Sequence, residues 1–218
     1  MVGAARFKVK SFKASPVFLK PTTLSFRTSD RVAVLAHDDI VLNGLIRILC
    51  RSLPLDEGQI TCDAFLSPPI GGMTSTNPAL TGLEGVKFAA RLYGVDEMQL
   101  FGSVQALTEG GDALYQKLRD MPPALRAQFN HALWLCIRFD TYLFQQNVVV
   151  GADKGYKDRC QWLLDEVMDR VGFILFTKRP KTALEFCDYG FVYQEGSLIP
   201  FQNMKMATDF FQSSDLAP

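Results

Sequence analysis

The sequence predicts an α/β fold, in which helices surround a central sheet and a helical subdomain is inserted. Short apolar runs of strand type alternate with stretches of helical spacing at both ends of the 218-residue chain. The region between them shows almost only helical spacing. We therefore expect a single domain with a core of about 1–78 and 139–218 and a helical lobe of about 79–138.

The centre of the predicted core is a strand, a turn and a helix. Arg31–Leu35 is an apolar run of strand type, residues 36–44 are a polar turn, and Val41–Cys50 repeats apolar residues at helical spacing. A strand, a tight turn and a helix form the frame of a phosphate-binding loop.

Short strands are expected before this frame. Residues 5–12, Val17–Leu19 and Leu24–Phe26 have strand character, which predicts an antiparallel β edge that leads into the central sheet. After the frame, Gln59–Phe65 is a further candidate strand. Residues 67–78 are rich in Pro, Gly, Ser and Thr, so they are expected to be a loop at the subdomain boundary.

The lobe begins with a helix signal, because Thr81 followed by Glu84 is a capping box. Residues 97–120 are amphipathic, with a break at Gly110-Gly111, and an apolar helical stripe runs from Leu125 to Cys136. The second part of the core again alternates. Strands are expected at Tyr142–Phe144, Val148–Val150 and Phe173–Thr177, helices at Tyr156–Val171, Pro180–Cys187 and Ala207–Phe211, and a hairpin joins Phe191–Tyr193 to Leu198–Phe201.

Composition excludes several classes of function. The formal net charge is zero, which gives no electrostatic basis for nucleic-acid binding. No apolar run approaches the ~18–20 residues of a membrane helix, and the basic N-terminus lacks the apolar segment of a signal peptide. The five cysteines have no CxxC spacing, so we expect reduced thiols and a cytoplasmic protein. With only His37 and His131, a histidine metal site is not expected. We expect His37 in a solvated turn and His131 on a helix surface or at a subdomain contact.

The turn lacks the chemistry that its frame suggests. A phosphate-binding loop reads G-x-x-x-x-G-K-[ST], so that backbone N–H groups wrap the phosphates and a lysine meets their charge. The corresponding positions hold Ala36, Val41, Leu42 and Asn43. Asp38 and Asp39 lie between them and are expected to cap the following helix, although two carboxylates could also hold a cation.

Four stretches in the right order carry a resemblance to a known family. They are residues 53–60 (LPLDEGQI), 80–95, 138–160 and 183–201. Together they resemble the ATP-binding subunits of ABC transporters, most closely the branch that serves capsular polysaccharide exporters. The resemblance implies a P-loop NTPase-like core with an antiparallel β edge and an inserted helical subdomain. It also implies head-to-tail dimers that dock on a membrane permease subunit through a groove beside the helical lobe, peripheral at the inner face of the inner membrane.

The resemblance also shows where this sequence departs from the family. Its glycine positions fall on Ala36, Asp39 and Val41, its lysine on Leu42, its magnesium hydroxyl on Asn43 with Gly44 next, its Walker B aspartate and catalytic glutamate on Gln145 and Gln146, and its switch histidine on Lys178. The Q-loop glutamine falls near Asn77 and the signature on Pro122-Pro123-Ala124. The loop after Walker B, around Gly151–Gly155, carries one extra residue, so its aspartate is Asp153 or is displaced.

These substitutions remove what phosphoryl transfer needs, which is charge neutralisation and a placed nucleophile. A carboxylate ~4 Å from a phosphate oxygen costs roughly 4 kcal/mol at an effective dielectric of 20. Gln145 is a weak magnesium ligand, and Gln146 cannot act as a base for water. We therefore expect no catalytic residue, no metal and no bound cofactor. Lys178 is expected to be a surface lysine at a strand end, although it could bind phosphate from an unusual side.

Three functions follow as hypotheses. The first is a catalytically inactive ABC-ATPase-like subunit that scaffolds or regulates polysaccharide export, paired with an active homologous ATPase subunit or with itself. The second is an active or weakly active ATP-binding subunit of such an exporter, which would use ATP and Mg. The third is a binding module outside transport that reuses the fold.

Overall fold

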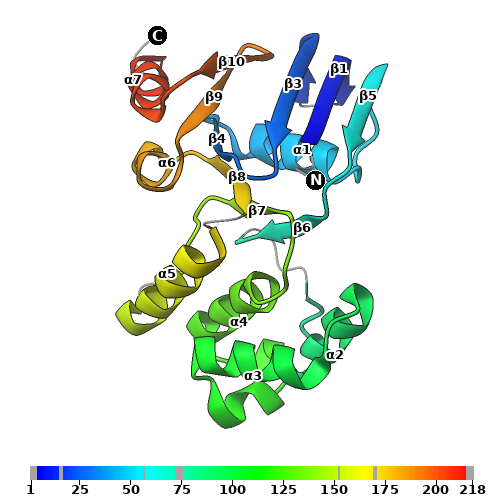
Figure 1. Cartoon of the computed structure of the whole chain (residues 1–218), viewed down its shortest axis with the longest axis vertical. Coiled ribbons are helices and arrows are strands. Elements are labelled where there is room, and N and C mark those ends of the chain that lie inside the picture. The colour runs from blue at the N-terminus through cyan, green and yellow to red at the C-terminus, as the bar shows by residue number, and fades with distance from the viewer. Residues whose placement is uncertain are drawn as a thin grey trace. The chain divides into compact units, whose positions relative to one another are not determined.

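The structure is a computed structural model that describes residues 4–14, 17–55, 57–71, 76–151, 153–168 and 171–214. The chain divides into two compact units (Figure 1). The first unit comprises Met1–Pro69, Phe139–Val148 and Arg170–Pro218, and the second comprises Ile70–Arg138 and Val149–Asp169.

The first unit contains a six-stranded sheet in the order β10-β9-β4-β8-β7-β6. Its strands are β4 (Arg31–Leu35), β6 (Leu66–Ile70), β7 (Thr141–Gln145), β8 (Gly172–Thr177), β9 (Tyr189–Gln194) and β10 (Ser197–Phe201). Strand β4 pairs in parallel with β8 and β9, and β7 pairs in parallel with β8. Every residue of β8 is buried, as expected of a strand at the centre of a parallel sheet. Because parallel strands end at the same edge, the segments after β4, β7 and β8 meet there.

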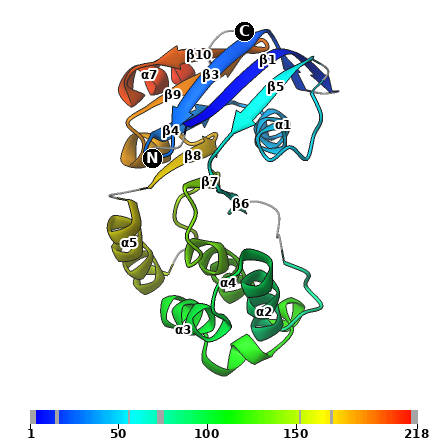
Figure 2. The ribbon, with the colours of Figure 1, turned by 45° about the vertical axis from the view of Figure 1, so that its right-hand side comes forward.

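The N-terminal strands form a sheet of their own. Strand β1 (Ala4–Ala14) pairs antiparallel with β2 (Val17–Leu19), β3 (Thr22–Arg27) and β5 (Glu57–Cys62). Figure 2 shows β1 between β3 and β5. The predicted antiparallel strands are therefore present, and they pair with one another rather than with the central sheet.

Helix α1 (Asp39–Leu49) packs on the six-stranded sheet through an apolar face. Its residues Leu42, Leu45 and Ile46 are buried in one cluster with residues of β4 and β8. Burying each such side chain stabilises the fold by about 1.5–3 kcal/mol. At the other end of the chain, α7 (Met204–Ser214) packs on β9 and on α6 (Pro180–Phe186).

The second unit is helical. It contains α2 (Gly82–Tyr93), α3 (Glu97–Thr108), α4 (Pro123–Leu135), α5 (Lys154–Met168) and two short 3₁₀ turns, Gly111–Tyr115 and Leu118–Asp120. The predicted capping box of α2 is present, with Thr81 and Glu84 bonded in both directions. Helix α3 packs against α2, α4 and α5. Residues 149–169, which the sequence analysis grouped with the core, make most of their contacts in this unit.

Several local predictions differ from the structure. The strand Leu66–Ile70 overlaps the start of the predicted loop, and it tolerates Pro68 and Pro69 because it lies at the edge of its sheet. Val148–Val150 contains no strand. In the amphipathic stretch 97–120, α3 ends at Thr108, close to the break predicted at Gly110-Gly111, and 3₁₀ turns rather than an α-helix follow it. Residues 72–75 of the boundary loop, Ala152 of the loop after Walker B and residues 169–170 of the helix predicted over Tyr156–Val171 lie outside the described residues.

The five cysteines carry free thiols, and Cys160 and Cys187 are buried. Burial raises the pKa of the Cys136 thiol to about 12 and that of Cys50 to about 11, so these thiols stay protonated near neutral pH. In the part of the chain that the structure describes, no helix has both the length and the apolarity to cross a membrane.

Candidate functional site

The turn at the predicted phosphate loop is short. Strand β4 ends at Leu35 and helix α1 begins at Asp39, so three residues connect them. Asp38 is the N-cap, and its Oδ1 accepts a hydrogen bond from the Ile40 N–H at 2.7 Å. The Leu42 N–H donates to the Asp38 carbonyl at 3.2 Å. The lysine position of the family therefore lies inside the helix, with its N–H used by the helix itself.

The apolar substitutions in this region face the core. Leu42 and Ala36 are completely buried, and Val41 is 7% exposed. A leucine packed in this way contributes to the core of the first unit rather than to the surface of the turn. The expected capping role of Asp38 is confirmed, because its side chain bonds the first turn of α1.

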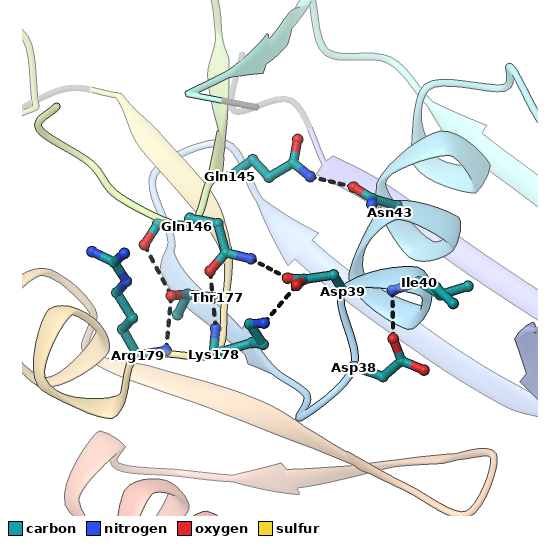
Figure 3. A network of polar contacts seen from close by, with 9 residues as sticks. All are labelled: Asp38, Asp39, Ile40, Asn43, Gln145, Gln146, Thr177, Lys178 and Arg179. Carbon is teal, nitrogen blue, oxygen red and sulfur yellow. Dashed lines mark hydrogen bonds and ion pairs between the residues drawn. The ribbon is translucent and has the colours of Figure 1, made fainter. Parts of the chain in front are cut away.

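Asp39 is the meeting point of three positions that the resemblance singled out (Figure 3). Its Oδ2 forms an ion pair with Lys178 Nζ at 2.5 Å, and its Oδ1 accepts a hydrogen bond from Gln146 Nε2 at 2.7 Å. A glycine position, the catalytic-glutamate position and the switch position are thus bonded to one another. Lys178 lies after β8 as expected, and the structure pairs it with Asp39, 139 residues away in sequence.

Gln146 is fixed through its backbone as well. Its φ of 69° lies in the left-handed region, which is unusual for a residue other than glycine. Its N–H donates to the Phe176 carbonyl at 2.7 Å and its carbonyl accepts from Thr177 Oγ1 at 2.9 Å. Its Oε1 also accepts from the Lys178 N–H at 3.3 Å. Strand β8 thereby holds the end of β7 in one conformation.

The two positions that would hold magnesium in the family contact each other. Gln145 Nε2 donates a hydrogen bond to Asn43 Oδ1 (Figure 3). Both groups are neutral amides, and neither provides the carboxylate or hydroxyl oxygen that a hard cation prefers. Among the described residues, no group of three His, Cys, Asp or Glu side chains is placed to hold a metal.

Three further residues take part that the sequence analysis did not assign to the site. Thr177 Oγ1 accepts a hydrogen bond from the Arg179 N–H at 3.0 Å, and Arg179 Nη1 donates to Asn147 Oδ1 at 2.9 Å. Their only sequence signal is position, since Thr177 ends β8 and the other two residues follow β7 and β8. Finding these residues from the sequence would have required knowing which strands of the sheet are neighbours and parallel.

His37 is exposed in the turn, as expected, and it also contacts the last helix of the chain. Its ring stacks on Phe211 of α7, with centroids 3.9 Å apart and planes within 6°. Its Nε2 lies 3.2 Å from Ser214 Oγ. The turn between β4 and α1 is therefore in contact with the last helix of the chain.

The other positions carried by the resemblance lie in the second unit. Asn77 Oδ1 accepts a hydrogen bond from the Ala79 N–H at 3.0 Å. Pro122 and Pro123 begin α4 and provide no side-chain cap. Asp153 Oδ1 accepts from the Tyr156 N–H at 2.5 Å, which anchors the start of α5. Each of these residues has a local structural role.

His131 is buried rather than on a helix surface, with 1% of its area exposed. Its Nδ1 lies 2.7 Å from the Tyr156 hydroxyl, which donates to the Gln128 carbonyl at 3.0 Å. Because that hydroxyl proton is used, His131 Nδ1 is the donor of the first contact. Burial raises the pKa of Tyr156, so the hydroxyl stays neutral and able to donate. The contact joins α4 to α5.

Comparisons with known proteins find relatives that cover most of the chain. No family model matches the sequence. The ATP-binding protein BexA of Haemophilus influenzae is 25% identical over 196 residues, which are 90% of each chain. The capsule polysaccharide export ATP-binding protein CtrD of Neisseria meningitidis is 24% identical over 89% of this chain and 90% of its own. The polysialic acid transport ATP-binding protein KpsT of Escherichia coli is 24% identical over 88% and 87%.

Solved structures show the same fold. The ATP-binding subunit of an ABC transporter superposes with a TM-score of 0.79 at 14% identity, over 94% of this chain and 92% of that one. A dimeric bacterial ABC transporter cassette, MJ0796, superposes with a TM-score of 0.72 at 14% identity, over 89% and 96%. The predicted α/β fold with a P-loop NTPase-like core is thereby confirmed.

Proposed function

We propose that this chain, a homologue of the ATP-binding subunits of capsule polysaccharide exporters, is a catalytically inactive subunit that scaffolds or regulates polysaccharide export. One observation carries the proposal. The side chains at the loop, Walker B and switch positions are bonded to one another, through Asp39 with Gln146 and Lys178 and through Asn43 with Gln145.

The charges of the site support this proposal. The lysine position holds a buried leucine, and the Lys178 ammonium is paired with Asp39. A triphosphate would have to displace Asp39 from that pair, and it would then face the carboxylates of Asp38 and Asp39. Each carboxylate at ~4 Å from a phosphate oxygen costs between about 1 and 4 kcal/mol, depending on exposure to water. The Leu42 N–H, which would meet the phosphates, is already bonded within α1.

The alternative is an ATP-binding subunit that binds or turns over ATP with Mg. It is supported by the relatives, whose names describe them as ATP-binding proteins. Residues of a partner could complete the signature in trans, but the lysine of the phosphate loop acts within its own chain.

An ATPase assay on the purified chain at millimolar Mg-ATP separates these two functions. We expect no turnover above that of the Gln146→Ala variant, which controls for contaminating ATPases. Turnover that disappears in Gln146→Ala would overturn the proposal.

A nucleotide-induced shift in melting temperature tests binding. A site with a Kd of about 10 µM would raise the melting temperature by about 5–10 °C at 1 mM ATP, and we expect no such shift.

An exposed surface on α2 supports the proposed partner. Phe88 and Leu92 are 56% and 60% exposed, four residues apart on one face of the helix. They line a hollow of about 480 Å³, together with Leu80, Glu84, Lys87 and Arg91. An apolar patch with a charged rim is typical of a protein–protein contact. We propose that a membrane permease subunit binds here, which places the chain at the inner face of the inner membrane, as a homodimer or paired with an active homologous subunit.

Affinity purification of the tagged chain from its native membranes tests this surface. We expect Phe88→Ser combined with Leu92→Ser to lose the permease, while Met98→Ser keeps it. Met98 is a suitable control because it is 76% exposed on α3 and does not line the hollow. Equal recovery of the permease by both proteins would exclude this surface. Recovery of soluble enzymes of sugar synthesis, and no permease, would favour a binding module outside transport.

A further inference from the structure

The turn between β4 and α1 is held from two sides. On one side Asp39 is bonded to Lys178 and Gln146, and on the other His37 contacts Phe211 and Ser214. These six residues come from four separate parts of the sequence, and we call them the turn clamp. Their contacts are all made between side chains of this chain, without a ligand.

The Asp39 side ties the start of α1 to the ends of β7 and β8. Asp39 lies in the first turn of α1, where the helix dipole favours a carboxylate. Gln146 and Lys178 bond to different oxygens of that carboxylate, and Lys178 N–H also bonds Gln146 Oε1. The resemblance assigns these three segments to the phosphate-loop, Walker B and switch positions. Here side chains connect them directly.

The His37 side ties the turn to α7. Phe211 is only 5% exposed, so its ring is fixed by the core and offers a rigid face to His37. Helix α7 is itself attached at its start, where the Met204 N–H donates to the Asp188 carbonyl at 3.1 Å and Ala207 is fully buried.

We propose that the turn clamp keeps the nucleotide position closed in the absence of ligand, and that α7 controls it through His37. A partner that shifts α7 would release one side of the turn. The inference concerns regulation of the same site and rests on the proposed function, since a bound nucleotide would replace the contacts of Asp39.

Hydrogen exchange of the full-length chain, measured by mass spectrometry, tests the clamp. The Ile40 and Leu42 amides report on the turn, because both bond to Asp38. We expect His37→Ala to speed exchange of the peptide covering residues 36–42 by about fivefold, and Asp39→Asn by a similar factor, which corresponds to the loss of about one hydrogen bond or ring contact. His37 and Asp39 are exposed, so both variants should fold.

Ser213→Ala is the matched control. Ser213 lies on α7 beside Ser214, and its hydroxyl bonds the Phe210 carbonyl rather than His37. We expect unchanged exchange of residues 36–42 in this variant, and faster exchange in Phe211→Leu, which keeps an apolar side chain but removes the ring. Exchange of residues 36–42 at the wild-type rate in His37→Ala would overturn the proposed control by α7.

Repeating the wild-type measurement with Mg-ATP keeps the two proposals distinct. Protection of residues 36–42 by the nucleotide would overturn the proposed function. The clamp is judged only from the variants without nucleotide, so its failure and the failure of the proposed function are distinguishable.

Discussion

The polar network around Asp39 and the polar contact between α4 and α5 differ chiefly in their exposure to water. The side chains of Asp39 and Lys178 are 52% and 41% exposed, whereas His131 and Tyr156 are 1% and 0% exposed. Water can replace a lost partner in the first network, so each of its contacts contributes little. In the second it cannot, and a lost partner leaves a buried polar group unsatisfied. Substitutions in the exposed network should therefore cost little folding stability, whereas substitutions in the buried contact should cost more.

The largest effect is expected on substituting Leu42, which belongs to the candidate site but is buried. Leu42 occupies the lysine position and is completely buried. We expect Leu42→Lys to lower the free energy of unfolding by about 3–5 kcal/mol, because it places an unpaired charge in the core. Urea denaturation measures the change. Leu42→Met is the control and should lower it by less than ~1.5 kcal/mol.

The opposite outcome of the Leu42→Lys experiment would be informative. A variant that keeps wild-type stability and is stabilised by Mg-ATP would mean that the new ammonium reaches a phosphate-binding turn. Residue 42 would then be a surface position, and the description of the turn as closed would be wrong.

The next largest effect is expected in the buried contact. Tyr156→Phe removes only the hydroxyl that joins His131 Nδ1 to the Gln128 carbonyl. The free energy of unfolding should fall by about 1–3 kcal/mol, the cost of leaving buried polar groups without a partner. Urea denaturation by circular dichroism measures it. Tyr115→Phe, at a tyrosine that is 55% exposed in the same unit, should change it by less than ~0.5 kcal/mol. Equal effects of the two changes would break the comparison.

Local patterns predicted the elements well, and long-range contacts set the limit. The strand–turn–helix at 31–50 and the Thr81–Glu84 capping box were predicted because their signals lie within a few residues of each other. Strand β6 was missed because its two prolines indicate a loop, and only its place at the sheet edge makes them acceptable.

The candidate site shows the same limit. The resemblance identified Asp39, Gln146 and Lys178 as separate departures from a motif, and no local pattern indicated that they bond to one another. The partners of Asp39 lie 107 and 139 residues away, and the parallel pairing of β8 with both β4 and β7 brings them together. Likewise, the buried His131 has its hydrogen-bond partner in Tyr156, 25 residues later in the sequence.

A double-mutant cycle examines the exposed network directly. Asp39→Asn and Lys178→Met, alone and combined, should give a coupling energy of about 0.2–1 kcal/mol, because both side chains are largely in water. The coupling should decrease further at high salt, since exposed charges are screened. Urea denaturation at low and high ionic strength measures both quantities. A coupling above ~2 kcal/mol that does not respond to salt would place this ion pair with the buried contact instead.

The smallest effect is expected at an exposed network in the helical unit. This network tests whether exposure to water, rather than the unit in which a contact lies, determines how much the contact stabilises the fold. Glu84 accepts hydrogen bonds from the Thr81 N–H at 2.8 Å and from its hydroxyl, and these bonds lower the pKa of Glu84 from its ordinary value of 4.5. A carboxyl whose pKa is lower in the folded chain stabilises the fold above its unfolded-state pKa, and this contribution is lost as the pH falls through the folded-state value.

Glu84→Gln keeps the shape of the capping box without the charge. The wild type should therefore be slightly more stable than Glu84→Gln at pH 7, and the difference should vanish on acidification below pH 4.5. Urea denaturation of both proteins across this range measures the difference. A difference that stays constant with pH would mean that the charge of Glu84 contributes nothing to the cap.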